Sequence, residues 1–387
     1  MSNSHADQFQ TLRVAAKRWE LSPYGERWVT SDVVYSVYAN RVAPVTLGTD
    51  AAADYWKLRN GAVLYDVPER PVSIEGPDAV RLLERVVARP VDTIRVGRGV
   101  YALACLPDGG ILMDGVLFRL SGDHFWYVQA DGDIENWMTA LGVDMDVVVS
   151  DPASRVLQIQ GPKSHEFLES ASGAPLPESF TWFAAQHFDL GGQRIYVSNS
   201  GWTGELGIEI YGHEGLDHLR LWDHLMEVGE QFDLTMGAGD SMGPRRVEAG
   251  ILDNKTDFDR TMTPFAAGLG AFVNFDNPHF IGRSALETAD RTRLLWGLTC
   301  ASATPGAGDK VRSDSEEVGW MTVGEWSPTL EIGIGYVRFT APTDGGWEGK
   351  TVTFVDRDGA EHAATVVALP FFDHDKLLPR GLGEPAR

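Results

Sequence analysis

The chain has 387 residues, of which 43% are hydrophobic and 23% charged, and its formal net charge is −22. This length predicts two or three domains with a substantial apolar core, and the composition excludes a disordered chain. The negative charge argues against a nucleic-acid or anionic-membrane binder, so an anionic ligand would need a local basic pocket.

The first part of the chain is predicted to alternate short strands and helices after a polar N-terminal arm. Apolar periodicity indicates a strand at 33–38, a turn-rich stretch at 41–48, a helix at 51–58, strands at 62–67 and 72–74, and a helix at 78–87. Asp-Gly and Gly-Asp turns then separate the strands of an antiparallel meander at 101–106, 115–120 and 124–130, which a helix at 131–141 follows.

The same order recurs in the second part, so we predict two α+β halves and not alternating βαβ units. Its elements are a strand at 155–160, a helix at 164–170, strands at 188–190, 194–198 and 207–211, and a helix at 216–232. After a short helix at 283–289, helical periodicity almost disappears. Strands at 295–299, 319–325, 332–338, 351–355 and 363–369 predict a small β-barrel or sandwich.

One carboxylate stands out in the meander. Residues 101–118 form a strand, a tight Asp-Gly-Gly turn and a second strand, and Asp114 lies inside the otherwise apolar second strand. Burial of a carboxylate costs free energy unless the group is hydrogen-bonded or used in chemistry. Asp114 is therefore either a turn-capping residue or a functional carboxylate.

The segment 200–211, SGWTGELGIEIY, carries a second candidate site. Its glycines allow close backbone approach, Trp202 offers a flat surface, and Glu209 follows as an acceptor. This combination suits a flat heterocycle, whose ring would stack on Trp202 while its amino-pyrimidine edge donates to Glu209. An ordinary hairpin is the alternative.

Three other motifs are weaker. The glycine-rich segment 237–243 is one residue too long for a dinucleotide loop and follows a helix, so we predict a tight turn that feeds a helix at 244–250. Residues 253–259 lack the glycine and the terminal glutamate of a calcium loop. Asp373-His374-Asp375 is interpreted as a solvated tail and not as a metal cluster.

Several classes of protein are disfavoured by what the sequence lacks. Residues 1–21 contain no apolar core of a secretion signal, and no segment approaches the roughly 18 apolar residues of a membrane span. Two cysteines are too few for a disulfide scaffold or a four-thiolate metal site. We therefore expect a cytoplasmic protein with no metal site, no membrane partner and no nucleic-acid partner, whose oligomeric state is unknown.

The segments around Asp114 and Trp202, in this order and separation, resemble those of the folate-dependent aminomethyltransferase family, which includes the T-protein of glycine cleavage. Ordered matches extend the resemblance over most of the chain, at 72–79, 157–164, 247–250, 280–286 and 334–337. The resemblance implies an α+β protein with three domains in a cloverleaf around a central folate cavity. We place the arm and first α+β domain at 1–145, the second α+β domain at 146–285 and the C-terminal β-barrel at 286–387.

The resemblance also implies tetrahydrofolate as the cofactor. Trp202 and Glu209 match the family positions that bind the pterin ring, and Phe118 matches a neighbouring aromatic residue. We expect Arg246 to meet the glutamate of the folate, with Arg245 as the alternative.

Asp114 matches the catalytic aspartate of the family, and Tyr101 matches an aromatic residue beside it. The donor of the one-carbon group would be a methylated small molecule. Tyr38 and Trp182 are our candidates for residues that bind this donor, because aromatic rings can hold either an aryl group or a cation.

Two departures from the T-protein pattern favour the demethylase branch, which includes dimethylsulfoniopropionate demethylase and aryl methyl-ether demethylases. Met113 replaces the first of two paired acids, and Gly239 stands where the T-protein carries an arginine. The sequence therefore predicts transfer of a methyl group from an O-, S- or N-methylated donor to N5 of tetrahydrofolate. The alternatives are the aminomethyltransferase of glycine cleavage and a folate-binding regulatory protein without catalysis.

Overall fold

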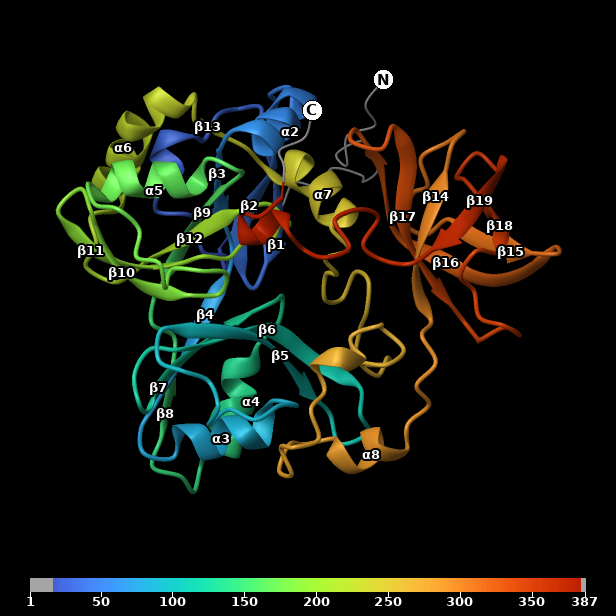
Figure 1. Cartoon of the computed structure of the whole chain (residues 1–387), viewed down its shortest axis with the longest axis horizontal. Coiled ribbons are helices and arrows are strands. Elements are labelled where there is room, and N and C mark those ends of the chain that lie inside the picture. Colours follow the sequence, from blue (N-terminus) through green and yellow to red (C-terminus); the bar gives the residue numbers. More distant parts are fainter. Residues whose placement is uncertain (1–16, 384–387) are drawn as a thin grey trace.

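The computed structural model describes residues 17–383. Residues 1–16, which belong to the expected arm and to the stretch tested for a secretion signal, lie outside the described residues, as do residues 384–387. Figure 1 shows two lobes of mixed helix and sheet next to a β-barrel, with the C-terminal segment running back from the barrel to the first lobe. A search of residues 17–383 finds no helix long and apolar enough to span a membrane.

The upper lobe in Figure 1 is built on a six-stranded sheet. Its strands lie in the order β10 (Ala185–Leu190), β11 (Gln193–Ser198), β12 (Gly207–Gly212), β9 (Arg155–Gln160), β3 (Val63–Val67) and β13 (Thr235–Met236). Helices α5 (Ser164–Ser172) and α6 (His218–Gly229) cover one face, where alternate residues such as Leu157 and Ile159 form the core. The intervening residues, including Gln158 and Glu209, therefore point to the other face.

The lower lobe is built on a five-stranded sheet. Its strands lie in the order β5 (Arg98–Cys105), β6 (Ile111–Arg119), β7 (His124–Gln129), β4 (Arg70–Glu75) and β8 (Val148–Ser150). Met113 and Leu117 of β6 face the core beneath α3 (Ala79–Val86) and α4 (Ile134–Leu141). Because side chains alternate along a strand, Asp114 and Phe118 face the opposite side, toward the upper lobe.

Each of the two sheets contains strands from both sides of the boundary that we placed between residues 145 and 146. Strand β3 lies inside the six-stranded sheet, between β9 and β13, although it precedes every strand of the five-stranded sheet in the chain. Strand β8 pairs with β4. The chain therefore passes between the lobes more than once, and the domain limits stay a prediction.

The C-terminal part forms a closed six-stranded barrel, as the sequence predicted. Its order is β14 (Leu295–Cys300), β17 (Ile332–Phe339), β16 (Glu316–Ser327), β15 (Lys310–Ser313), β18 (Thr351–Val355) and β19 (Glu361–Val367). Helix α7 (Gly239–Glu248) lies between the barrel and α2 (Ala51–Asn60) of the upper lobe. The helix thus begins within the glycine-rich segment, earlier than expected, and contains Pro244.

The remaining elements connect these bodies. Strands β1 (Val34–Tyr38) and β2 (Arg41–Thr46) form a hairpin where we expected a strand and a turn-rich stretch. The linker from α7 to the barrel contains η3 (Gly270–Phe272) and α8 (Arg283–Thr288), while η1 (Gly25–Arg27) and η4 (Leu378–Arg380) lie near the chain ends. The C-terminal segment is held on α7 because the Phe371 amide donates to the Glu248 carbonyl at 3.1 Å.

Candidate active site

A cavity of about 410 Å³ lies where the two lobes, the linker and the C-terminal segment meet. Its lining includes six of the residues singled out from the sequence: Tyr38, Tyr101, Asp114, Trp182, Trp202 and Glu209. A smaller cavity of about 190 Å³ adjoins it. The two cavities share Tyr38, Glu69 and Trp202 in their linings, so these residues stand at the junction.

Asp114 lines the larger cavity and is almost completely buried. The residue is 7% exposed, and Oδ2 accepts a hydrogen bond from the Tyr101 hydroxyl at 2.8 Å. Its buried Oδ1 has no hydrogen-bond partner among residues 17–383. Burial raises the pKa of Asp114 to about 6, although the hydrogen bond from Tyr101 opposes the shift. At neutral pH the group is therefore mostly ionised.

Trp202 lies in the turn that joins β11 to β12, and Glu209 lies on β12 just after it. One oxygen of Glu209 accepts from the hydroxyls of Ser200, at 2.5 Å, and Tyr211, at 2.8 Å. The other accepts from Nε2 of Gln158 at 2.8 Å. These bonds fix the carboxylate, while the partly exposed ring of Trp202 forms a flat wall beside it.

Two residues that we did not predict extend this polar corner. Nε2 of Gln158 also donates to Glu69 at 2.9 Å. Within the described part of the chain, Glu69 Oε2 and Gln158 Oε1 are buried without a hydrogen-bond partner. Burial and the negative charge of Glu209 raise the pKa of Glu69 well above its ordinary value. Gln158 gave the signal that we used for Asp114, a polar residue in an apolar strand, whereas Glu69 gave none.

Phe118 occupies a different place from the one expected. It is fully buried in the apolar layer between the two sheets, and its ring centroid lies 6.2 Å from that of Tyr211. Tyr38 and Trp182, our candidates for donor binding, do reach the larger cavity.

The two consecutive arginines of α7 are both engaged in ion pairs. Nη1 of Arg246 donates to Asp257 at 2.8 Å, and its guanidinium lies 5.0 Å from the ring centroid of Trp202. Arg245 is 1% exposed and pairs with Glu205. Among the described residues, the lysine and arginine side chains that line the larger cavity are instead Lys376 and Arg293.

The donor set of the cavity fits a folate. Carboxylate and amide oxygens at one corner match the N–H edge of a pterin, Trp202 matches its flat ring, and the cations of Lys376 and Arg293 match an anionic tail. Burial lowers the pKa of Lys376 to about 8, so it is mostly charged at neutral pH. No group of three or more His, Cys, Asp or Glu side chains within residues 17–383 is placed to hold a metal ion.

Comparison with known families identifies the fold. Residues 31–277 match the GCVT N-terminal domain, and residues 293–373 match the C-terminal barrel domain of the glycine cleavage T-protein. The chain belongs to this family. Its members are folate-dependent aminomethyltransferases and their relatives, which use tetrahydrofolate as cosubstrate.

The relatives that match the chain include proteins named for two different activities. The chain is 32% identical over 337 residues to an aminomethyltransferase of Halothermothrix orenii, covering 84% of this chain and 92% of the relative. It is 29% identical over 308 residues to the dimethylsulfoniopropionate demethylase of Ruegeria pomeroyi, covering 78% and 83%. The aminomethyltransferase T of Bartonella henselae, 23% identical, has the same fold, with a TM-score of 0.81 over 92% of this chain and 98% of its own. The family and the fold expected from the sequence are thus confirmed.

Proposed function

We propose that this protein is a tetrahydrofolate-dependent demethylase, which transfers a methyl group from an O-, S- or N-methylated small molecule to N5 of tetrahydrofolate. The observation that carries the proposal is the position of Asp114. Asp114 lines the same aromatic cavity as Trp202 and Glu209, and one of its carboxylate oxygens has no hydrogen-bond partner among the described residues. A pterin held at that corner and a donor beside Asp114 would share one enclosed space.

The polar corner would hold the acceptor. Glu209 and Glu69 would accept hydrogen bonds from the pterin edge, Trp202 would stack on the ring, and Lys376 would meet the glutamate carboxylates. Tetrahydrofolate supplies the nucleophilic N5. Because N5 is a modest nucleophile, most of the acceleration would come from its orientation toward the methyl carbon in a cavity that excludes water.

Asp114 would stabilise positive charge and transfer protons at the reacting atoms. Its carboxylate stabilises positive charge that develops at N5 and takes the proton that N5 loses. The Tyr101 hydroxyl holds this carboxylate in one orientation. A sulfonium or quaternary ammonium donor leaves as a neutral group and needs no proton, whereas an ether oxygen would require the protonated form of Asp114.

Two features support a demethylase over an aminomethyltransferase. Met113 packs into the core beneath the helices and brings no second acid to the site. Gly239, where the T-protein pattern has arginine, lies against β2, and a Cβ there would be 3.4 Å from the Val45 carbonyl. The hairpin that covers Gly239 also brings Tyr38 to both cavities.

The test measures tetrahydrofolate binding by tryptophan fluorescence and then methyl-tetrahydrofolate formation with sulfonium, betaine, methylamine and methoxyaryl donors. We expect binding and turnover with one donor class. An absence of tetrahydrofolate binding would contradict the roles proposed for Trp202 and Glu209. Binding without turnover by any donor would favour the regulatory alternative.

The second candidate is the aminomethyl transfer of glycine cleavage, which the 32% identical aminomethyltransferase favours. An assay with an aminomethylated lipoyl carrier protein separates the two. Methylene-tetrahydrofolate and ammonia from that substrate would replace the demethylase proposal with this alternative.

A further inference from the structure

The turn at residues 199–206 presents Trp202, and Gln160 of β9 bonds to it on both sides of this ring, at the Ser200 carbonyl and the Thr203 hydroxyl. It joins β11 to β12 and contains Gly201 and Gly204, which give its backbone freedom. Gly204 has φ +69°, and a Cβ there would lie 2.4 Å from the Cβ of Ala249. The turn thus packs closely against the C-terminal end of α7.

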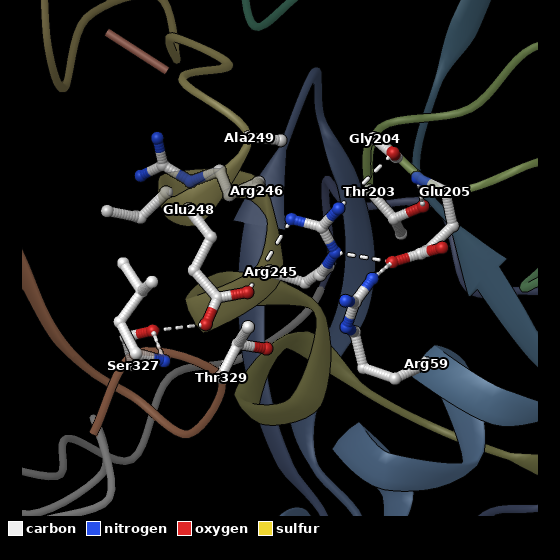
Figure 2. Close-up of polar contacts among 12 residues, drawn as sticks. Arg59, Thr203, Gly204, Glu205, Arg245, Arg246, Glu248, Ala249, Ser327 and Thr329 are labelled. Atoms are coloured by element: carbon white, nitrogen blue, oxygen red, sulfur yellow. Dashed lines mark hydrogen bonds and ion pairs between the residues drawn. The ribbon is translucent and has the colours of Figure 1, made fainter. Parts of the chain in front are cut away.

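Arg245 of α7 ties two adjacent residues of this turn. Its Nε donates to Oε1 of Glu205 at 2.7 Å, and its Nη2 donates to the Gly204 carbonyl at 3.3 Å (Figure 2). Arg59 of α2 pairs with the same carboxylate oxygen of Glu205. One side chain therefore fixes both the backbone and the buried acid that follow Trp202.

Arg245 is itself held from the opposite side. Its Nη1 lies 3.5 Å from Oε2 of Glu248, which accepts from the Tyr55 hydroxyl at 2.7 Å. The Ser327 hydroxyl, at the end of β16, donates to the other oxygen of Glu248 at 2.5 Å. The two arginines and two glutamates balance in charge, and the barrel, α2 and α7 together fix the position of Arg245.

The ring of Trp202 is supported by the next residue of the helix. Figure 2 shows Arg246 pointing away from Arg245, and its guanidinium lies 5.0 Å from the Trp202 ring centroid. Arg245 thus holds the backbone of the turn, and Arg246, the next residue of α7, supports the ring of Trp202. Arg245 lies outside both cavity linings, so it acts on a ligand indirectly, through the turn it holds or through its charge near Lys376.

We propose that Arg245 is a positioning residue for folate binding, which acts through Glu205 and Gly204 to hold Trp202 against the cavity. The inference rests on the proposed function only in its choice of tetrahydrofolate as the probe. Lysine at this position would keep the charge but lose the fork of N–H donors that reaches both partners.

The experiment compares Arg245→Lys with the wild type and with Arg70→Lys, a control at the partly buried ion pair of Arg70 and Asp151, 2.8 Å long. We expect Arg245→Lys to raise the Kd for tetrahydrofolate by about tenfold, with kcat at saturating folate changed by less than about twofold. The control should leave both values unchanged. A double variant, Arg245→Gln with Glu205→Gln, keeps the buried charge balanced and should fold, yet still bind folate weakly.

A measurement on the ligand-free protein tests the proposal even if tetrahydrofolate does not bind. The protein is labelled with 5-fluorotryptophan, and the Trp202 resonance is assigned by its loss in Trp202→Phe. Arg245→Lys and the double variant should shift or broaden this ¹⁹F resonance, whereas Arg70→Lys should not. An unchanged Trp202 resonance, or a wild-type Kd in both Arg245 variants, would overturn the positioning role. Absence of folate binding by the wild type would instead remove the proposed function.

Discussion

At the scale of single residues, the chemistry depends on how Asp114 is held. An amide at this position would still accept the hydrogen bond from Tyr101 but could neither carry the negative charge nor take a proton. We expect Asp114→Asn to lower turnover by about 10²-fold or more, the usual contribution of a positioned acid or base. The Kd for tetrahydrofolate should change little. Unchanged methyl-tetrahydrofolate formation would remove Asp114 from the mechanism.

The burial of Asp114 should also reduce the stability of the fold. Its pKa rises from an ordinary value of 3.8 to about 6. Between these values the native state binds more protons than the unfolded state, so stability falls as pH rises through this window. Asp114→Asn should therefore gain up to about 3 kcal/mol at about pH 7.5 and lose this advantage below about pH 4. Urea denaturation at both pH values tests this, and equal stabilisation at both would contradict it.

Glu209 is expected to contribute mainly to binding. Its carboxylate is fixed by three neighbouring side chains before any ligand arrives. Because hydrogen bonds to charged groups contribute about 1.5–3 kcal/mol, Glu209→Gln should raise the Kd for tetrahydrofolate by about tenfold or more. Fluorescence titration measures this, with Glu75→Gln on the exposed end of β4 as the control. Equal Kd values in the two variants would refute the assignment.

Asp114 could be singled out because it interrupts an apolar strand, and Glu209 because it follows Trp202 in one short segment; both patterns are local. Glu69 could not be found in this way. It becomes part of the polar corner only because Gln158, 89 residues away in the chain, donates to it. The place of Phe118 was missed for the same reason, since the layer between the two sheets exists only once both sheets are built.

At the scale of elements, the end of α7 is stabilised by the barrel. The hydroxyl of Tyr336, on β17, lies 2.9 Å from the Val247 carbonyl, 3.3 Å from that of Arg246 and 3.1 Å from that of Ile251. The carbonyls of Val247 and Arg246 also accept from the amides of Gly250 and Ile251, so this hydroxyl adds a further donor from the barrel and caps the end of α7.

Tyr336→Phe should remove this cap. We expect a loss of about 1 kcal/mol in the free energy of unfolding, the usual net contribution of one hydrogen bond, because the carbonyls keep their other donors. The control is Tyr196→Phe, whose buried hydroxyl has no hydrogen-bond partner among the described residues and should be dispensable. Urea denaturation of both variants measures the difference, and equal midpoints would show that the Tyr336 hydroxyl does not stabilise α7.

Strands and helices could be predicted from the sequence where the hydrophobic pattern extended over many residues. The meander and the barrel strands showed clear alternation, whereas β15 has four residues and a single buried apolar side chain, Val311. The start of α7 was missed because Gly239 and Pro244 both disfavour helices. Its contacts with β16 and α2 outweigh that local preference.

At the scale of the whole molecule, the net charge of −22 should oppose compactness. Repulsion between surface carboxylates is screened by salt, with a Debye length of about 8 Å at about 0.15 M ionic strength. We therefore expect Tm to rise when NaCl is added to about 0.15 M from a low-salt buffer. Thermal unfolding monitored by circular dichroism tests this. A Tm that stays constant or falls would show that pairing such as that of Arg59 with Glu205 already compensates the excess charge.

The position of β3 also constrains synthesis of the protein on the ribosome. This strand emerges early, yet its neighbours β9 and β13 begin at residues 155 and 235. The five-stranded sheet, by contrast, is complete once residue 150 has left the exit tunnel. The lower lobe can therefore fold while translation continues, whereas β3 can pair with β9 only after residue 160, and its second neighbour β13 follows when more than half of the chain has been made. During that interval the nascent chain is a natural client for a ribosome-associated chaperone.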